Sequence, residues 1–117
     1  EGTFKERFKH LWRNLINYCI ENPEEFHFVE QYRYAPFVSN VTREESFIIL
    51  APIMSFFIES KRAGAMKDLP LYTIVSLLYG PIVSLAKLHI DHNQSLTDER
   101  IDQASEACWD AVRKHEE

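Results

Sequence analysis

The sequence is poor in glycine and cysteine. Three glycines in 117 residues are too few for a glycine-rich phosphate-binding loop, which excludes a nucleotide cradle. The two cysteines, Cys19 and Cys108, lie far apart without metal-ligand spacing, and we expect buried thiols in a reducing, cytoplasmic compartment. Serine and cysteine nucleophile signatures are also lacking. We therefore expect no catalytic residue, no metal and no cofactor.

Basic residues are also scarce. The chain has 13 lysines and arginines against 18 acidic residues, whereas binding to nucleic-acid phosphates needs clustered basic side chains. The chain alone is therefore not expected to bind DNA. It begins EGTFKERF, without an initiator methionine or a signal-peptide pattern, so we expect a piece of a longer protein. With 45% hydrophobic and 26% charged residues, positions 1–117 have the balance of a single globular domain.

No segment has a convincing strand pattern, and hydrophobic periodicity predicts an all-α fold of about five helices. The expected helices are about 3–22, 23–34, 42–64, 69–92 and 97–114. A Thr-x-x-Glu capping box opens the first helix at Thr3 and the third at Thr42. Thr97 is the expected N-cap of the fifth. Pro52 is expected to bend the third helix, and Gly64 to end it in a left-handed turn.

The stretch LPLYTIVSLLYGPIVSLA, residues 69–86, is uncharged and long enough to raise the question of a membrane span. A lipid environment is disfavoured because the flanks, 67–68 and 87–92, carry charges of both signs rather than a basic bias. Gly80-Pro81 is also expected to break the hydrogen-bond ladder at mid-span. We interpret the stretch as a central helix of a soluble domain, covered by protein.

On a helix, residues 69–92 separate into three strips. The aliphatic strip is Ile74, Leu78, Leu85 and Leu88, and the mixed aromatic and aliphatic strip is Tyr72, Val75, Tyr79, Ile82, Ala86 and Ile90. The small-residue strip is Thr73, Ser76, Gly80 and Ser84, continued by Lys87 and Asp91. Small residues at steps of three and four let another backbone approach closely. We therefore expect the small-residue strip to pack closely against a surface that the other two strips do not contact.

The order of these segments resembles the C-terminal domain of the tetracycline-repressor (TetR) family of bacterial transcriptional regulators. The resemblance is carried by residues 4–37, 59–89 and 96–114, nearly the whole chain. Its most telling part is the closing pattern, LTDE followed by an acid-flanked helix that ends near a tryptophan. In that family an N-terminal helix-turn-helix domain binds operator DNA. That domain is absent from these 117 residues, so the resemblance implies operator binding only through a missing domain.

The resemblance also implies a homodimer, because the last two long helices of that family form a four-helix bundle between subunits. Carried over, residues 70–92 and 97–114 are the dimerisation pair, with Lys87 and Asp91 placed to pair across the two-fold axis. The implied interface residues are Ser76, Gly80, Ser84, Lys87, Asp91, Ile101, Cys108 and Val112. An alternative stays open, in which the small-residue strip packs against the third helix or faces water.

Aromatic residues make up 13% of the chain, and many lie on segments that surround a small-molecule pocket in that family. Such pockets are mostly apolar with a few oriented polar groups. The candidate ligand contacts are Trp12, Phe26, Tyr32, Phe37, Met54, Phe57, Tyr72 and Tyr79. For any one of them a plain core position is the simpler interpretation, but bends at Pro52 and Pro81 are expected to leave cavities. The expected effector is small and apolar or aromatic, and it shifts operator affinity through a population shift.

Two histidine motifs suggest a metal site. Glu24-x-x-His27 has the spacing of di-iron bundles, but we find no second pair and no buried acid to complete it. His89-x-x-His92 could hold a metal, although histidines in a last helical turn more often interact with the terminal carbonyls.

A second class of function is also compatible with the sequence, namely a helical protein-interaction module with an apolar groove and no small ligand. The two classes differ in the shape of the apolar site. A closed cavity would favour the small ligand, and an open groove would favour a partner helix.

Overall fold

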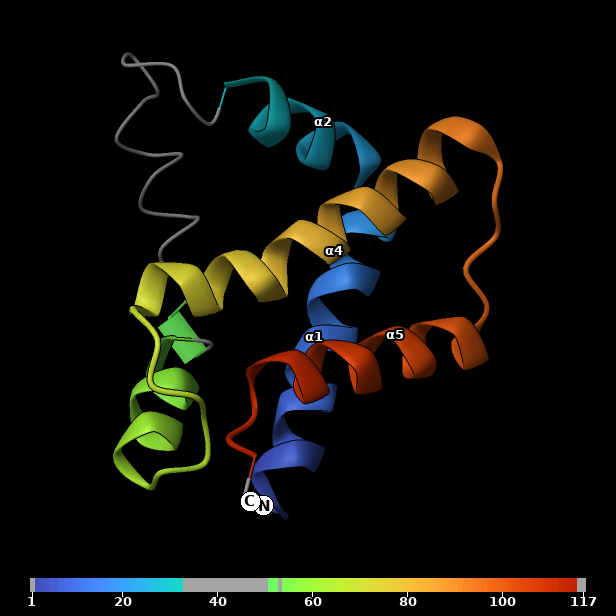
Figure 1. Cartoon of the computed structure of the whole chain (residues 1–117). Coiled ribbons are helices and arrows are strands. Elements are labelled where there is room, and N and C mark those ends of the chain that lie inside the picture. Colours follow the sequence, from blue (N-terminus) through green and yellow to red (C-terminus); the bar gives the residue numbers. More distant parts are fainter. Residues whose placement is uncertain (1, 33–50, 53, 116–117) are drawn as a thin grey trace.

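The computed structural model describes residues 2–32, 51–52 and 54–115 (Figure 1). The helices are α1 (Phe4–Glu21), α2 (Pro23–Tyr32), α4 (Leu71–His92) and α5 (Asp98–Val112), together with a helical segment at 54–62. In this part of the chain, β-structure is limited to one isolated bridge between Met66 and Arg113. The predicted all-α class is confirmed.

The first helix begins at its predicted capping box. The Thr3 hydroxyl accepts a hydrogen bond from the backbone N–H of Glu6 at 3.1 Å, and the Glu6 carboxylate accepts one from the backbone N–H of Thr3 at 3.0 Å. These bonds satisfy free amides of the first turn, and the bond that the N–H of Thr3 donates to the carboxylate lowers the pKa of the Glu6 carboxyl. At the other end, the N–H of Asn22 donates to the carbonyl of Tyr18, and α1 ends before Pro23 as expected.

Gly64 ends the helical segment 54–62 in the predicted left-handed conformation, with φ +75°. The N–H of Ala65 donates to the carbonyl of Ser60 at 2.9 Å, which satisfies a carbonyl of the last turn. The predicted start of this helix at Thr42 lies outside the described residues.

The fourth helix is continuous from Leu71 to His92 and includes Pro81. The expected helix of residues 69–92 thus passes through Gly80-Pro81 without ending, and the proline removes one backbone hydrogen bond within it. This helix is long and apolar enough to cross a membrane, a property that it shares with core helices of water-soluble proteins.

The fifth helix starts as predicted and ends slightly early. The hydroxyl of Thr97 accepts a hydrogen bond from the N–H of Arg100 at 3.2 Å and caps α5. The helix ends at Val112, two residues before the expected end at 114.

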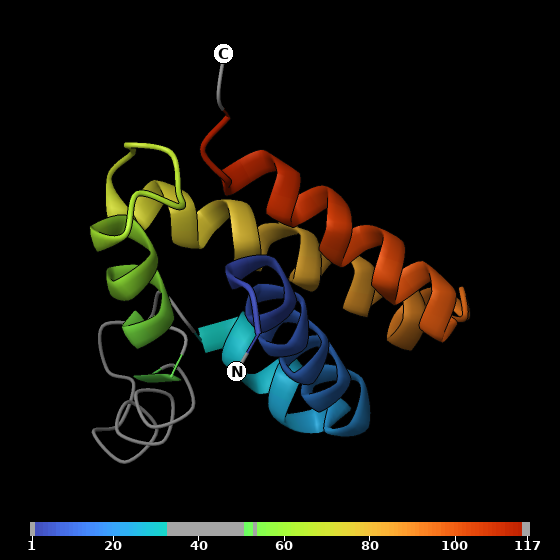
Figure 2. The ribbon, with the colours of Figure 1, turned by 90° about the horizontal axis from the view of Figure 1, so that it is seen from below.

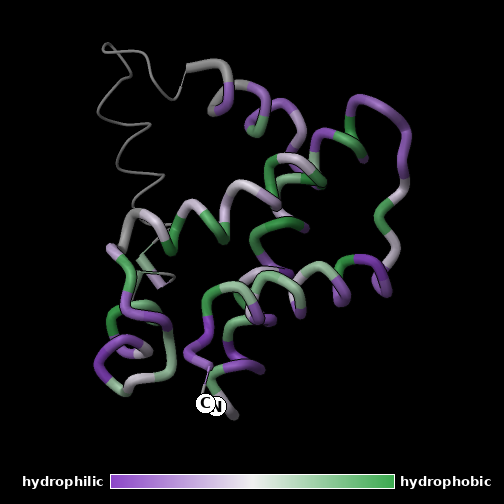
Figure 3. Tube along the Cα trace, viewed as in Figure 1, coloured by the Kyte–Doolittle hydropathy of each residue, from purple (hydrophilic) through white to green (hydrophobic). Residues whose placement is uncertain are grey.

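Helix α1 is at the centre of the arrangement. It crosses behind α4 and α5 and contacts α2, α4 and α5 (Figures 1 and 2). The largest fully buried side chains come from α1, α4, α5 and segment 54–62: Trp12, Phe8, Phe57, Ile16, Ile74, Ile82 and Val112. The loop between α4 and α5 is mostly hydrophilic, with one hydrophobic stretch in its middle (Figure 3). The core thus lies between α1 and the inner faces of its neighbours.

Salt bridges connect α1 to α5 along one side. The ammonium of Lys9 lies 2.8 Å from Asp102 and 3.2 Å from Glu106, and Lys5 also pairs with Glu106. Arg13 reaches Asp102 at 3.4 Å. We call these five residues the α1–α5 ladder.

The chain after α5 pairs with the loop before α4. The N–H of Lys67 donates to the carbonyl of Val112, and the N–H of Lys114 donates to the carbonyl of Ala65, each at 2.9 Å. The ammonium of Lys67 also donates to the carbonyl of Ala111 at 2.8 Å. These bonds hold the end of α5 against residues 65–67.

Candidate functional site

The outer face of α4 carries the predicted small-residue strip. Ser76, Gly80 and Ser84 are all exposed. Two large apolar side chains lie beside them, Leu77 at 38% and Leu88 at 42% exposure. The sequence pattern did not assign Leu77 and placed Leu88 in an aliphatic strip. The structure brings both leucines to the same outer face as the small residues.

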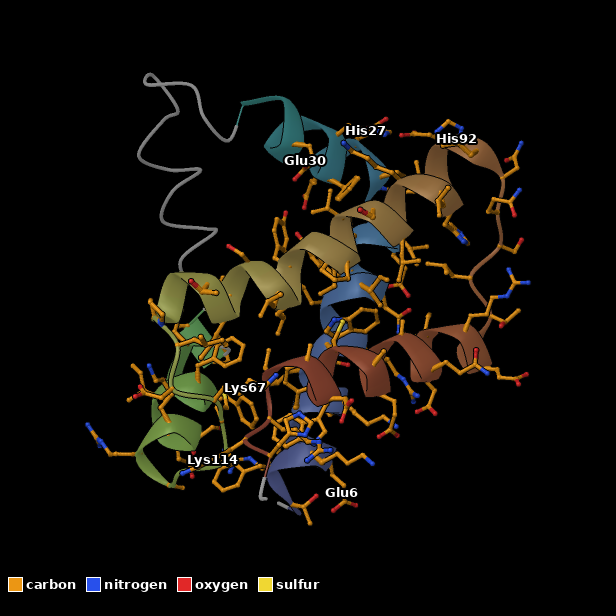
Figure 4. The ribbon with its side chains drawn as sticks, in the orientation of Figure 1. Glu6, His27, Glu30, Lys67, His92 and Lys114 are labelled. Atoms are coloured by element: carbon orange, nitrogen blue, oxygen red, sulfur yellow. The ribbon has the colours of Figure 1, made fainter. Side chains whose placement is uncertain are left out.

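The two charged residues of the strip have partners within the chain. Asp91 lies 2.8 Å from the ring of His27, and Lys87 lies 3.9 Å from Glu30, so both contacts reach α2 (Figure 4). The expectation that Lys87 and Asp91 lie ready to pair across a two-fold axis took no account of α2. Helix α2 runs close enough to α4 to supply opposite charges within the same chain, and pairing of Lys87 and Asp91 across an axis stays a prediction.

Three predicted interface residues of α5 face the chain's own core. Ile101, Cys108 and Val112 are 3%, 6% and 0% exposed. The prediction put them on the wrong face of the helix, because the apolar stripe of α5 packs against α1 and α4. The outward face carries Arg100, Gln103 and Ala107 instead, which are all exposed.

An open groove of about 860 Å³ lies between the last turns of α4 and the first turns of α5. Leu85, Leu88, Leu96 and Ala104 supply its apolar lining, and His92 and Arg100 are among its polar members. It continues the exposed apolar face of α4 at Leu88. The sequence analysis kept an open apolar groove as an alternative but assigned no residues to it, because the position of a groove depends on how two helices pack together.

The candidate ligand contacts divide into buried and partly buried groups. Trp12, Phe57 and Phe26 are 0%, 0% and 5% exposed, and Met54 and Tyr79 are partly buried. Among the described residues the indole N–H of Trp12 has no hydrogen-bond partner. The remaining candidates fall outside what the structure describes: Phe37 entirely, and Tyr32 and Tyr72 as side chains.

A largely buried carboxylate, Glu30, was not predicted from the sequence. Its side chain is 10% exposed, and it accepts a hydrogen bond from the hydroxyl of Tyr79 at 3.3 Å. The signal in the sequence is its position one helical turn after the apolar Phe26, which puts both on the same face of α2.

The histidine motifs have other partners. His89 accepts a hydrogen bond on Nδ1 from the N–H of Leu96 at 3.0 Å, so it holds the loop after α4 rather than the terminal carbonyls. His27 pairs with Asp91, and Glu24 is exposed. Among the residues that the structure describes, no three His, Cys, Asp or Glu side chains gather as metal ligands.

Comparison with known proteins decides the family. A family model described as "Tetracyclin repressor-like, C-terminal domain" matches residues 3–113. The chain belongs to this family. A comparison with curated proteins gave no match.

Solved structures share the fold of this TetR-like domain. A TetR family transcription regulator from Marinobacter aquaeolei VT8 has a TM-score of 0.80 and 22% identity over 95% of this chain and 58% of its own. One assigned to the same family from Shewanella sp. PV-4 has a TM-score of 0.76 and 20% identity, over 98% and 62% of the two chains. A third, from Vibrio parahaemolyticus, has a TM-score of 0.69 and 27% identity, over 97% and 60%. The TetR-like chain thus spans about three fifths of the length of these regulators.

Proposed function

We propose that this TetR-like domain binds a small ligand, pairs with a second copy, and regulates a DNA-binding domain outside these 117 residues, in the cytoplasm. The family match over residues 3–113 supports the regulatory role. The net charge of −5 disfavours contact with DNA phosphates, which agrees with operator binding by another part of the protein. We assign the domain no catalytic role.

The observation that carries the dimer is the exposed face of α4. Gly80 and Ser84 would let a second α4 approach closely, and Leu77 and Leu88 would be removed from water on either side. The outward face of α5 would complete the bundle through Gln103 and its neighbours. This set replaces Ile101, Cys108 and Val112, which are already buried within one chain.

The ligand site would lie on the other side of α4. Phe26 and Tyr79 come from helices that face each other there, and Trp12 and Phe57 bring apolar surface from α1 and segment 54–62. A ligand held by these elements would favour one arrangement of the helices over another. A coupling of about 1 to 3 kcal/mol would change operator affinity roughly 5- to 150-fold.

The dimer is tested by the variant Gly80→Leu. A Cβ at Gly80 would meet no described atom within 4 Å, and no left-handed φ requires glycine there. Leucine also suits a helix interior better than glycine by about 1 kcal/mol. We expect size-exclusion chromatography with light scattering to give a dimer for the wild type and a monomer for Gly80→Leu, with unchanged far-UV circular dichroism.

The matched control is Ser55→Leu, which also places a leucine at an exposed helical position but on segment 54–62, outside the proposed interface. It should leave the dimer intact. A stable dimer in Gly80→Leu would contradict the proposed interface. A wild-type monomer that binds a foreign amphipathic helix in the α4–α5 groove would instead support the protein-interaction module.

A further inference from the structure

The α4–α5 groove is an apolar site apart from the proposed ligand pocket. Helices α2 and α5 lie on opposite sides of α4 (Figure 1), and the groove is on the α5 side. Its volume of about 860 Å³ falls within the roughly 300 to 1,000 Å³ of small-ligand sites. It therefore has room for a ligand of its own.

Hydrogen bonds fix the loop that closes one end of the groove. The N–H of Leu96 donates to Nδ1 of His89 at 3.0 Å, and the N–H of Gln94 donates to the carbonyl of Leu88 at 3.0 Å. Thr97 then caps α5. Leu96 is thus held against the last turns of α4, where it lines the groove. Because this end is already ordered, binding carries little further cost in loop entropy.

The groove changes from apolar to basic along its length. Leu85 and Leu88 supply the α4 wall, and Ala104 leaves space on the α5 wall because its side chain is small. His92 and Arg100 lie at the loop end, in the last turn of α4 and the first turn of α5. Leu85 and His92 are seven residues apart on one helix face, which is about 10 Å. The shape suits a molecule with an alkyl chain of about that length and a head group at the loop end.

The loop end of the groove offers a cation. The Arg100 side chain is exposed, and its hydrogen bond to the carbonyl of Ser95 is long, at 3.4 Å. Among the described residues its guanidinium has no ion-pair partner. Asp98 and Glu99 precede it, but side chains one or two residues apart on a helix do not share a face, and no carboxylate of the described residues lines the groove. A guanidinium binds a carboxylate through two parallel hydrogen bonds, so the head group that fits here is an anion.

We propose that the α4–α5 groove binds an amphipathic anion, with its alkyl chain between Leu85 and Ala104 and its carboxylate on Arg100. Leu88 lines the groove and also belongs to the face on which a second copy is proposed to pack. The anion and the second copy therefore compete for this surface, and binding of the anion favours the monomer. This regulation rests on the proposed dimer, whereas the binding itself does not.

The probes are decanoate and decyltrimethylammonium, which carry the same alkyl chain and opposite charges. Each is titrated into the 117-residue chain, and binding is followed by the backbone amide signals in NMR spectra. We expect decanoate to shift the signals of Leu88, Leu96 and Arg100, and to bind at least about tenfold more tightly than decyltrimethylammonium. Equal binding of the two probes would mean that the groove does not recognise charge, which overturns the proposal.

Variants of the two helix walls locate the site. Arg100→Gln removes the cation and should weaken decanoate binding about tenfold. The matched control, Arg62→Gln, removes an exposed arginine from segment 54–62, outside the groove, and should leave binding unchanged. Ala104→Leu fills the space between the helices and should also weaken binding, with Arg100 in place. Far-UV circular dichroism establishes that each variant is folded, and decanoate binding by Arg100→Gln as tight as that of the wild type would contradict the proposal.

Light scattering separates this proposal from the proposed dimer. Decanoate should convert the wild-type dimer to monomer, and Gly80→Leu, which is expected to be monomeric, should bind decanoate more tightly than the wild type. A dimer that persists with decanoate bound contradicts the competition. A wild type that is monomeric without ligand contradicts the dimer alone, because the NMR titration reports binding by itself. If decanoate binds neither the wild type nor Gly80→Leu, the groove is not an anion site, and a partner helix becomes its candidate occupant.

Discussion

Burial changes the chemistry of the Cys19 thiol. Removal from water, with a further contribution from the nearby charge of Glu30, raises its pKa to about 11 from an ordinary value of 9.0. Because the thiolate is the reactive form, the native thiol at about pH 8 should react with Ellman's reagent roughly 100-fold more slowly than in unfolded chain. The measurement uses a Cys108→Ser variant, so that Cys19 is the thiol observed.

The control for this prediction is the same variant in guanidinium chloride, where the thiol regains its ordinary pKa and access to solvent. Native labelling as fast as unfolded labelling would contradict the burial of Cys19. In a Cys19→Ser variant, the native Cys108 thiol should also react more slowly than in the unfolded chain, since burial raises its pKa as well.

For single residues, sequence patterns predicted those whose role depends on residues close to them in the sequence. Thr3, Thr97 and Gly64 act on backbone groups within a few residues, so their spacing was sufficient. The partners of Lys87 and the low exposure of Glu30 depend on how α2 lies against α4. Contacts between separate helices leave no comparable local pattern, which is why these two were missed.

The α1–α5 ladder joins two helices, and its ion pairs should make the stability of the folded chain depend on pH. The pKa of Asp102 is lowered chiefly by its bond from Lys9, and that of Glu106 by its bonds from Lys5 and Lys9, from ordinary values of 3.8 and 4.5. These carboxyls therefore stabilise the folded chain fully above their ordinary pKa values. The contribution is lost as the pH falls through the lower values of the folded state.

The variant Lys9→Met tests this contribution. We expect it to lower the melting temperature at about pH 7, because Asp102 and Glu106 lose a shared partner. The effect should be smaller near pH 3, which lies below the ordinary pKa values of both carboxyls, so that part of their contribution is already lost. Lys114→Met, which removes an exposed lysine outside the ladder, is the matched control. An equal effect of Lys9→Met at both pH values would mean that its ion pairs contribute nothing measurable, as many exposed pairs do.

For whole elements, sequence predicted positions better than orientations. The bounds of α1, α4 and α5 followed from caps and apolar periodicity, to within two residues. The stripe of Ile101, Cys108 and Val112 identified the apolar side of α5. It did not show whether that side packs against the same chain or against a second subunit. A single apolar stripe packs against the core of its own chain first, so the surface left for another subunit is the polar side.

At the scale of the molecule, pairing of two copies predicts a melting temperature that depends on protein concentration. If a dimer of 117-residue chains melts as one unit, a tenfold increase in concentration should raise the melting temperature by about 3 °C. Differential scanning calorimetry across two decades of concentration measures this shift. Gly80→Leu should melt at one temperature throughout, whereas a concentration-independent wild type would contradict the dimer.

The pairing between residues 65–67 and the end of α5 has a mechanical consequence. Helices α4 and α5 are joined at one end by the loop 93–97, and at the other by three hydrogen bonds from Lys67 and Lys114. The two helices thus form a closed frame that cannot open like a hinge at either end without breaking these bonds. If a ligand binds, α2 would shift relative to this frame more easily than α1, because α1 packs against both α4 and α5 and its salt bridges tie it to α5.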